Sequence, residues 1–175
     1  MDGCVAASAR VDQNVFCEKD NPRTALVATV FPDRSRNDYL LTADAARISV
    51  ETIHRWLSTE AYWAQGRSHE AVATSIENSF LYAIVNNDAQ TVACVRIITD
   101  HVTFAWVSDV FVDAAHRGRG LGSWMVGEVV DYWVGLGVRR VLLATRDAHE
   151  VYAKVGFTPL AHPERMMEVD RRAAF

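Results

Sequence analysis

The apolar residues of this chain form short β-branched runs in some segments and recur at helical spacing in others, which predicts a mixed α/β fold. Three runs near the middle of the chain are separated by short polar turns, a pattern typical of an antiparallel meander. A shorter run at Tyr39–Thr42 predicts a strand before them. The three central runs are Phe80–Val85, Thr91–Ile98 and Val102–Val112.

Three segments show the apolar period of a helix. Ser49 begins the first, whose apolar residues continue through Trp56 and Leu57, and His69–Asn78 is predicted as the second. An aromatic loop, Ser58–Ser68, lies between them. The third is the longest, and two glycines supply its stop. Its apolar residues at helical spacing are Leu121, Met125, Val129, Tyr132 and Leu136, and the two glycines are Gly135 and Gly137.

The C-terminal quarter predicts a strand, a short helix and a last strand. The apolar run Val138–Ala144 has the length of a buried strand, which would lie parallel to its predecessor across the intervening helix. Asp147 and Glu150 form a capping pair for a short helix that Gly156 ends. The two candidates for the last strand are Phe157–Leu160 and Met166–Val169.

Length and composition favour one globular domain. A chain of 175 residues, half of them hydrophobic, can bury one proper core but is short for two. Residues 1–37 show no sustained period apart from the apolar run Ala25–Phe31, so we interpret them as an N-terminal extension. Its end is the polar cluster 32–37, which predicts a linker or turn. Residues 38–175 then form the domain.

Charge and cysteine usage exclude several classes of function. The net charge is -4, so no excess of basic residues is available for nucleic acid or an anionic membrane. The sequence has neither an apolar span of membrane length nor a secretion signal pattern. Its three cysteines form no CxxC pair, which argues against a zinc site or a disulfide framework. We therefore expect a cytoplasmic protein.

A glycine-rich segment between an apolar strand and a helix is the sharpest chemical signal. Glycines let backbone N–H groups approach an anion closely, and a helix N-terminus favours negative charge, so a pyrophosphate is the natural ligand. The segment lacks the lysine of a P-loop and the acidic partner of a dinucleotide fingerprint. Its candidate ligand-binding residues are Arg117, Gly118, Arg119, Gly120, Leu121, Gly122 and Ser123.

One carboxylate stands inside an apolar strand. Burying Asp109 without a partner would cost several kcal/mol, so some interaction must require it there. It could be a catalytic base, an anchor for a substrate ammonium group, or an acceptor for backbone amides at a bulge. The histidines show no metal-ligand spacing, so no metal is expected.

These motifs together resemble the GNAT superfamily of N-acetyltransferases. The glycine segment, Arg117-x-x-Gly120-x-Gly122, looks like the acetyl-CoA pyrophosphate motif of that superfamily, and Tyr152-x-x-x-Gly156-Phe157 looks like the segment that follows it. The resemblance covers roughly residues 39–169. Upstream it is closest to bacterial single-domain members of unassigned acceptor, through the strings Trp56-Leu57-Ser58, Tyr62-Trp63 and Gly66-Arg67-Ser68.

The resemblance implies a mixed, mostly antiparallel sheet with flanking helices, in which two strands splay apart and admit the cofactor. The pyrophosphate of acetyl-CoA would rest on residues 117–123, with Asp147 and Tyr152 beside the cofactor. The pantetheine arm would pair with the backbone of the preceding strand as an added strand. The strand residues concerned are Val110, Phe111 and Val112.

The resemblance also implies direct transfer of the acetyl group of acetyl-CoA to a primary amine of a small molecule, with CoA as product. Tyr152 is the candidate proton donor to the leaving thiolate, although it could merely pack against the cofactor. Candidate acceptor contacts, with core packing as the alternative, are Trp56, Tyr62, Trp63, Arg67 and Asp109. The rival function is a non-catalytic acyl-CoA-binding module. A homodimer is possible.

Overall fold

A computed structural model describes residues 31–171, which contain one six-stranded sheet in the order β1-β2-β3-β4-β5-β6. Each pair of neighbouring strands is antiparallel except β5 and β6, which are parallel. The strands are β1 Arg34–Arg36, β2 Tyr39–Thr42, β3 Phe80–Asn86, β4 Thr91–Thr99, β5 Ala105–Val112 and β6 Val141–Leu142.

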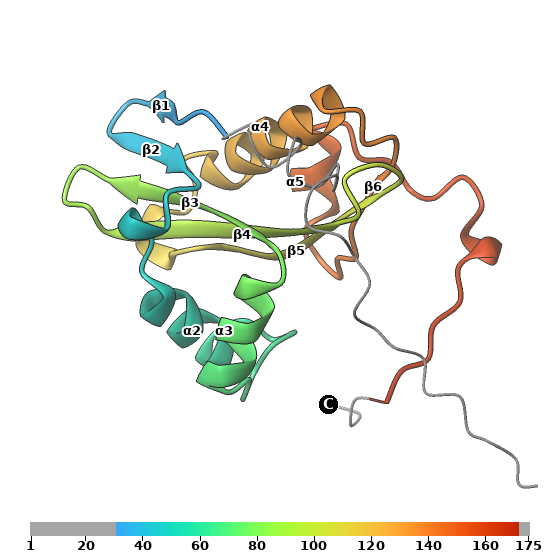
Figure 1. Cartoon of the computed structure of the whole chain (residues 1–175), viewed down its shortest axis with the longest axis horizontal. Coiled ribbons are helices and arrows are strands. Elements are labelled where there is room, and N and C mark those ends of the chain that lie inside the picture. The colour runs from blue at the N-terminus through green and yellow to red at the C-terminus, as the bar shows by residue number, and fades with distance from the viewer. Residues whose placement is uncertain (1–30, 172–175) are drawn as a thin grey trace, which may run out of the picture. The chain divides into compact units, whose positions relative to one another are not determined.

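Helices cover both faces of the sheet (Figure 1). Helix α4, Leu121–Gly135, lies on one face, and α2, Val50–Thr59, lies with α3, His69–Glu77, on the other. The short helix α5, His149–Ala153, packs on α4, and Gly127 of α4 leaves room for Val155 just after α5. Among the described helices, none is long and apolar enough to cross a membrane.

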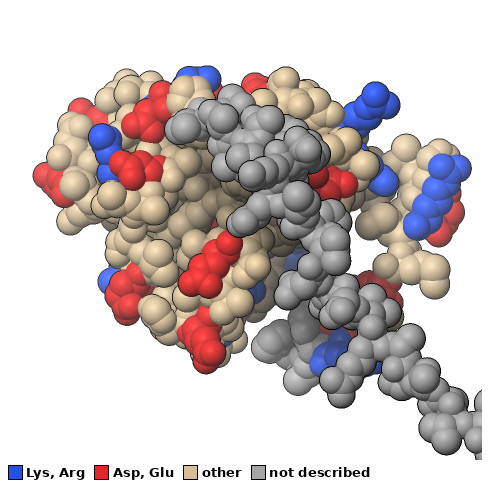
Figure 2. Space-filling view, viewed as in Figure 1, with Lys and Arg blue, Asp and Glu red and all other residues tan. Residues whose placement is uncertain are grey.

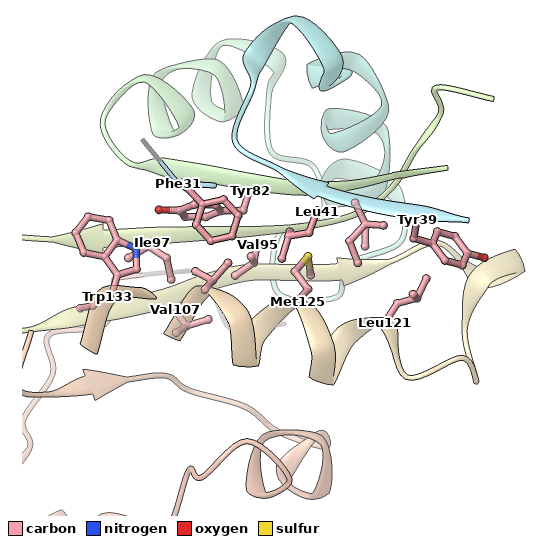
Figure 3. Close-up of a cluster of buried hydrophobic side chains, with 14 of the residues drawn as sticks. Phe31, Tyr39, Leu41, Tyr82, Val95, Ile97, Val107, Leu121, Met125 and Trp133 are labelled. Carbon is pink, nitrogen blue, oxygen red and sulfur yellow. The ribbon is translucent and has the colours of Figure 1, made fainter. Parts of the chain in front are cut away.

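Two hydrophobic cores follow from this layering. The larger lies between the sheet and α4, where Leu41, Val95 and Met125 are fully buried (Figure 3). The smaller lies between the sheet and the α2–α3 pair. Burial of a large apolar side chain is worth about 1.5–3 kcal/mol, so the two cores hold the sheet firmly between its helices. The main residues of the smaller core are Ile53, Trp56, Leu57, Val72 and Phe111.

A bulge in β5 changes which face its side chains meet. Opposite Val95, the register between β4 and β5 shifts by one residue, and Asp109 has a φ of 49°. Before the bulge, Val107 joins the core on the α4 side, whereas Phe111 after it joins the core on the α2–α3 side. One extra residue thus reverses the alternation along the strand.

The structure confirms most of the predicted elements. Strand β2 has the bounds predicted for it, Tyr39–Thr42. Ser49 caps α2 by accepting a hydrogen bond from the Thr52 backbone N–H. Ser68 caps α3 in the same way. The strand after α4 is parallel to β5 as expected, although it is limited to Val141–Leu142.

The boundary drawn at residue 37 needs correction. Residues 34–36, predicted as part of a turn, form β1 and pair with β2, because the turn is confined to the two residues between these strands. Phe31 is 5 % exposed and packs edge-on against Tyr82, so it belongs to the larger core. The rest of the proposed extension, residues 1–30, lies outside the described residues.

Two predictions at strand ends were wrong. Residues 102–104 form a turn instead of the start of β5, because the Asp100 carboxylate accepts hydrogen bonds from the backbone N–H groups of Val102, Thr103 and Phe104. Neither candidate for the last strand, Phe157–Leu160 or Met166–Val169, forms a strand. Residues 158–171 are exposed and make no strand pairing, and Met167 and Val169 are among the most exposed apolar side chains.

Candidate functional site

Strands β5 and β6 separate almost as soon as they pair. Only Ala105 with Val141 and Trp106 with Leu142 are in register, while β5 continues to Val112. From Val107 onward, that edge of β5 has no partner strand among the described residues. A free strand edge presents N–H and C=O groups that can bind an extended ligand. The predicted splay is therefore present at Val110, Phe111 and Val112.

The glycine segment lies at the far end of β5 and forms the N-terminus of α4. Gly118 and Gly120 have φ of 76° and 72°, which side chains strongly disfavour. Gly120 is the N-cap of α4 and provides no side-chain hydrogen bond. The first N–H groups of the helix, at Leu121, Gly122 and Ser123, are therefore free to bind an anion. The Leu121 side chain itself is buried in the core, so only its backbone can contribute.

Three arginines surround this helix end without a carboxylate partner among residues 31–171. Arg117 donates from Nε to the Val112 carbonyl at 2.9 Å, and Arg119 donates to the Tyr39 hydroxyl at 3.1 Å. Arg36 on β1 donates to the Gly120 carbonyl at 3.4 Å. We call residues 117–123 together with Arg36 the cradle. Because none of the three arginines forms a salt bridge within the described residues, the cradle has an excess of positive charge.

Sequence reasoning did not identify Arg36, because its segment was taken for a linker. The only available signal was the alternation Arg34-Ser35-Arg36 ahead of an apolar strand, which is too short to predict a hairpin. In the structure, Arg36 also lies 5.8 Å from the centroid of the Trp124 ring. Arg34, two residues earlier, pairs instead with Glu128 on α4 at 3.2 Å.

Asp109 is buried at the bulge and is paired by three donor residues, one on β4 and two in the loop between α2 and α3. Its side chain is 4 % exposed and faces the α2–α3 side of the sheet. Arg96 on β4 approaches within 2.9 Å, Arg67 donates to both carboxylate oxygens at 3.1 and 3.2 Å, and Trp63 donates from its indole at 3.3 Å. One role left open from the sequence was that Asp109 accepts hydrogen bonds from backbone amides at a bulge. The donors are side chains instead.

Arg96 is a second residue that sequence reasoning missed. It is a charged residue within the apolar strand Thr91–Thr99, just as Asp109 is within the next strand. Two opposite charges in neighbouring strands of a predicted meander are the signal that could have identified the pair. Arg96 also donates to the Ser75 carbonyl and to the Ser108 hydroxyl, each at 3.3 Å.

The loop between α2 and α3 contacts both sides of the β5–β6 opening. Trp63 and Arg67 bind Asp109 on β5, whereas the Tyr62 ring packs against the Arg146 guanidinium, which follows β6, at 3.6 Å. Tyr62 and Trp63 pack edge-on at 5.0 Å. All three loop side chains, Tyr62, Trp63 and Arg67, are partly exposed.

Trp56, predicted with them as an acceptor contact, lies in the core instead. It is 1 % exposed and stacks on Phe111 at 5.1 Å between ring centroids. Its position on the helix face that turns toward the sheet explains the burial, because Ile53 and Leu57 share that face. The core-packing alternative therefore describes Trp56.

Tyr152 lies on α5 and is partly buried. Burial, together with the nearby Tyr62 and Asp147, raises the pKa of Tyr152 above its ordinary value, which keeps the hydroxyl protonated. Asp147 does not cap the helix as predicted. The N-cap is Ala148, whose N–H donates to the Thr145 hydroxyl at 3.0 Å, while Asp147 is exposed and pairs with Arg146 at 3.6 Å.

Together these features define an α/β protein in which a helix N-terminus without a side-chain cap lies beside a free strand edge. The family model for the acetyltransferase (GNAT) family matches residues 50–157. A candidate acetyltransferase of Gibberella zeae is 30% identical over 141 residues, covering 69% of this chain and 78% of that protein. The chain belongs to the GNAT acetyltransferase family.

Solved structures agree with this assignment. A candidate GNAT acetyltransferase from Xanthomonas campestris pv. campestris is 36% identical, with a TM-score of 0.71, covering 75% of this chain and 92% of that one. A Mycobacterium tuberculosis protein crystallised with CoA has the same fold at 20% identity and a TM-score of 0.58, covering 69% of this chain and 72% of that one. The fold is the GNAT fold, as the sequence motifs implied.

Proposed function

We propose that this protein transfers the acetyl group of acetyl-CoA to a primary amine of a small molecule. The observation that carries the proposal is the alignment of three features along β5. These are a free strand edge, a helix N-terminus without a side-chain cap, and three arginines without acidic partners among the described residues. A ligand with a diphosphate at one end and an amide chain at the other fits this order of groups.

In this arrangement, the first N–H groups of α4 and the arginines would bind the pyrophosphate of acetyl-CoA. The backbone of Val110, Phe111 and Val112 would pair with the pantetheine arm as an added strand. The relative from Mycobacterium tuberculosis was crystallised with CoA, which supports the same use of this fold here. The thioester would then reach the β5–β6 opening, between the α2–α3 loop and α5.

The transfer itself forms a C–N bond from the amine to the acetyl carbonyl and breaks the C–S bond of the thioester. The amine must attack in its neutral form, and the departing thiolate needs a proton. Tyr152 is the proposed donor, because a tyrosine hydroxyl is protonated at neutral pH, and burial, which raises the pKa of Tyr152, leaves it in that form. Solvent would take up the proton that the attacking nitrogen loses as the amide forms, and Tyr152 would regain its own proton from solvent after CoA leaves.

The environment of Cys94 supports direct transfer without an acyl-enzyme. Cys94 is the free cysteine among the described residues, and it is 1 % exposed. Burial raises the pKa of the Cys94 thiol far above its ordinary value, and the thiolate is the form that attacks a thioester. A thiol that is both inaccessible and protonated cannot accept the acetyl group.

Two measurements test the proposal. Acetyl-CoA should raise the thermal midpoint, whereas NAD and ATP at the same concentration should not, because only a ligand that binds the native state stabilises it. A screen of amines with acetyl-CoA, following release of the CoA thiol, should then identify a substrate. Stabilisation without turnover of any amine would favour the rival acyl-CoA-binding module, and equal stabilisation by ATP would rule out the proposed cofactor.

A further inference from the structure

We infer that the acceptor amine also carries an acidic group, carboxylate or phosphate, which binds to Arg67. In this inference, Asp109 is a positioning residue for Arg67 and does not abstract a proton. The inference rests on the proposed function, since it assigns the acceptor class at the same opening. Four observations carry it: the charge balance around Asp109, the unused donors of Arg67, the occupied oxygens of Asp109, and the position of the loop.

The charge balance around Asp109 leaves one positive charge uncompensated. Two guanidinium groups, from Arg67 and Arg96, share the single carboxylate of Asp109. Neither arginine forms a salt bridge with any other acidic group among the described residues. Arg96 is 10 % exposed and Arg67 is 27 % exposed, so water screens this charge only in part. An anion bound here would compensate it.

The two arginines differ in how many of their donors are used. Each nitrogen of the Arg96 guanidinium is engaged, because Nε binds Asp109, Nη1 binds the Ser75 carbonyl and Nη2 binds the Ser108 hydroxyl. Arg67 makes hydrogen bonds only from Nη1 among the described residues, and these go to Asp109. Its Nε and Nη2 groups remain available on one edge of a planar fork. That edge matches the two oxygens of a carboxylate or a phosphate.

The oxygens of Asp109 have little capacity left for catalysis. Oδ1 accepts from Trp63 and Arg67, and Oδ2 accepts from Arg67 and Arg96. A carboxylate has about four lone-pair sites, and these contacts engage them. A general base needs a free lone pair that faces the proton it removes. Asp109 instead holds Arg67 against the strand that lines the opening.

The loop places Arg67 on the acceptor side of the opening. Its neighbours Tyr62 and Trp63 lie between Asp109 on β5 and Arg146 beyond β6, and Tyr62 is close enough to Tyr152 to raise the pKa of that hydroxyl. One end of the loop thus meets the acid-binding arginine, and the other meets the candidate proton donor. An acceptor with an acidic group and an amine can extend from Arg67 toward Tyr152.

The test compares acceptors that differ only in the acidic group. The carboxylate arm uses L-phenylalanine with L-phenylalaninamide, and L-lysine with L-lysinamide. The phosphate arm uses O-phosphoethanolamine with ethanolamine, and glucosamine 6-phosphate with glucosamine. We expect the acidic member of at least one pair to have the higher kcat/KM by about tenfold or more, since a charge-assisted bidentate contact is lost without it.

Arg67→Gln should bring the ratio for that pair close to one, because KM for the acidic member rises when its bidentate contact is lost. Arg55→Gln is the matched control, because Arg55 is exposed on the adjacent helix α2 and forms no salt bridge among the described residues. Arg67→Lys should recover part of the preference, because it keeps the charge and loses the fork. If Arg67 were only structural, its substitution would lower kcat/KM equally for the acidic and the neutral acceptor.

The outcomes separate this inference from the proposed function. A protein that acetylates neutral and acidic members equally, or that keeps its preference in Arg67→Gln, overturns the inference and leaves the acetyltransferase intact. If no amine in the panel is acetylated, the same pairs are compared as ligands of the CoA-saturated protein through the thermal midpoint. Equal shifts for acidic and neutral members would then overturn the inference as well.

Discussion

Arg67 donates hydrogen bonds to both carboxylate oxygens of Asp109, at 3.1 and 3.2 Å, although the two residues are 42 positions apart in sequence. This contact joins the α2–α3 loop to the bulge of β5. It also makes the carboxylate the common partner of two arginines, so its removal leaves both without compensation. The consequence for stability is larger than for an exposed ion pair.

Asp109→Asn should lower the free energy of unfolding by about 3–5 kcal/mol, because breaking a buried pair leaves charge uncompensated. Urea unfolding measures the change. Asp131→Asn is the control, since Asp131 is exposed on α4 and forms no salt bridge among the described residues. That control should stay within about 0.5 kcal/mol of wild type. A loss below about 1 kcal/mol for Asp109→Asn would contradict the buried-pair account.

Gly120→Val should greatly weaken acetyl-CoA binding. The residue sits at a φ of 72°, and an added Cβ would lie 3.6 Å from Nη2 of Arg36, so the side chain would both strain the backbone and crowd the anion site. Isothermal titration with CoA gives the affinity. Gly135→Val is the matched control, because nothing lies within 4 Å of a Cβ there. Equal affinities in the two variants would argue against the cradle.

Arg36→Gln should weaken CoA binding by about three- to tenfold and reduce its dependence on salt, because one exposed cation would be lost from the phosphate site. Arg34→Gln offers a close comparison, since Arg34 lies on the same strand but pairs with Glu128 at 3.2 Å. Titrations at two ionic strengths distinguish the variants. If both lose affinity to the same extent, Arg36 contributes only to the general charge of β1.

Tyr152→Phe should reduce kcat by about 10²–10⁴-fold and leave CoA affinity nearly unchanged, because the ring still packs while the proton donor is lost. The ring contact to be preserved is with Phe157, at 5.9 Å between centroids. Steady-state kinetics and a CoA titration give the two quantities. A wild-type kcat, with chemistry shown to be rate-limiting, would transfer the donor role to water.

Stability should fall as the pH rises above about 10. Burial raises the pKa of Tyr82 above its ordinary value of 10.0, so the folded protein keeps a proton that the unfolded chain releases. The contribution of Tyr82 is complete below pH 10 and declines by up to about 1.4 kcal/mol per pH unit above it. Urea unfolding between pH 8 and pH 11 measures the slope. Tyr82→Phe should flatten it, and an unchanged slope would assign the effect to other groups.

The parts of the fold that the sequence predicted are those in which local chemistry and burial agree. Helix α2 begins at a serine cap and shows a strong apolar face, and β2 to β4 are apolar runs between polar turns. The failures occur where a local interaction competes with the pattern. Asp100 binds the backbone of 102–104 and delays β5, and α5 begins after Ala148 without a side-chain cap, one residue later than the expected Asp147 cap.

The candidate site was predictable as far as it depends on consecutive residues. The glycine segment and the aromatic loop are contiguous, so sequence alone located them. Arg96 and Arg36 reach the site from other strands through pairing that a single sequence does not specify. The same limit explains Trp56, because only the packing of α2 on the sheet shows that it stacks on Phe111 inside the core.

The described charged residues are of both signs on the face of the molecule that Figure 2 shows. On the face shown in Figure 2, acidic and basic side chains of the described residues are interspersed and form no continuous basic surface. A nucleic acid would need such a surface to neutralise its phosphates. The basic residues that matter for the proposed chemistry are instead gathered at the cradle and around Asp109.

The two binding regions occupy separate stretches of the chain. The cradle comes from β1 and residues 116–123, whereas the acceptor side comes from the loop at residues 60–68. In the proposed function, substitutions at loop residues other than Trp63 and Arg67, which bind Asp109 on β5, would alter which amine is accepted and leave the cradle residues unchanged. Acceptor preference could then change, by design or by evolution, through substitutions in one short surface segment, while the residues proposed to bind CoA stay the same.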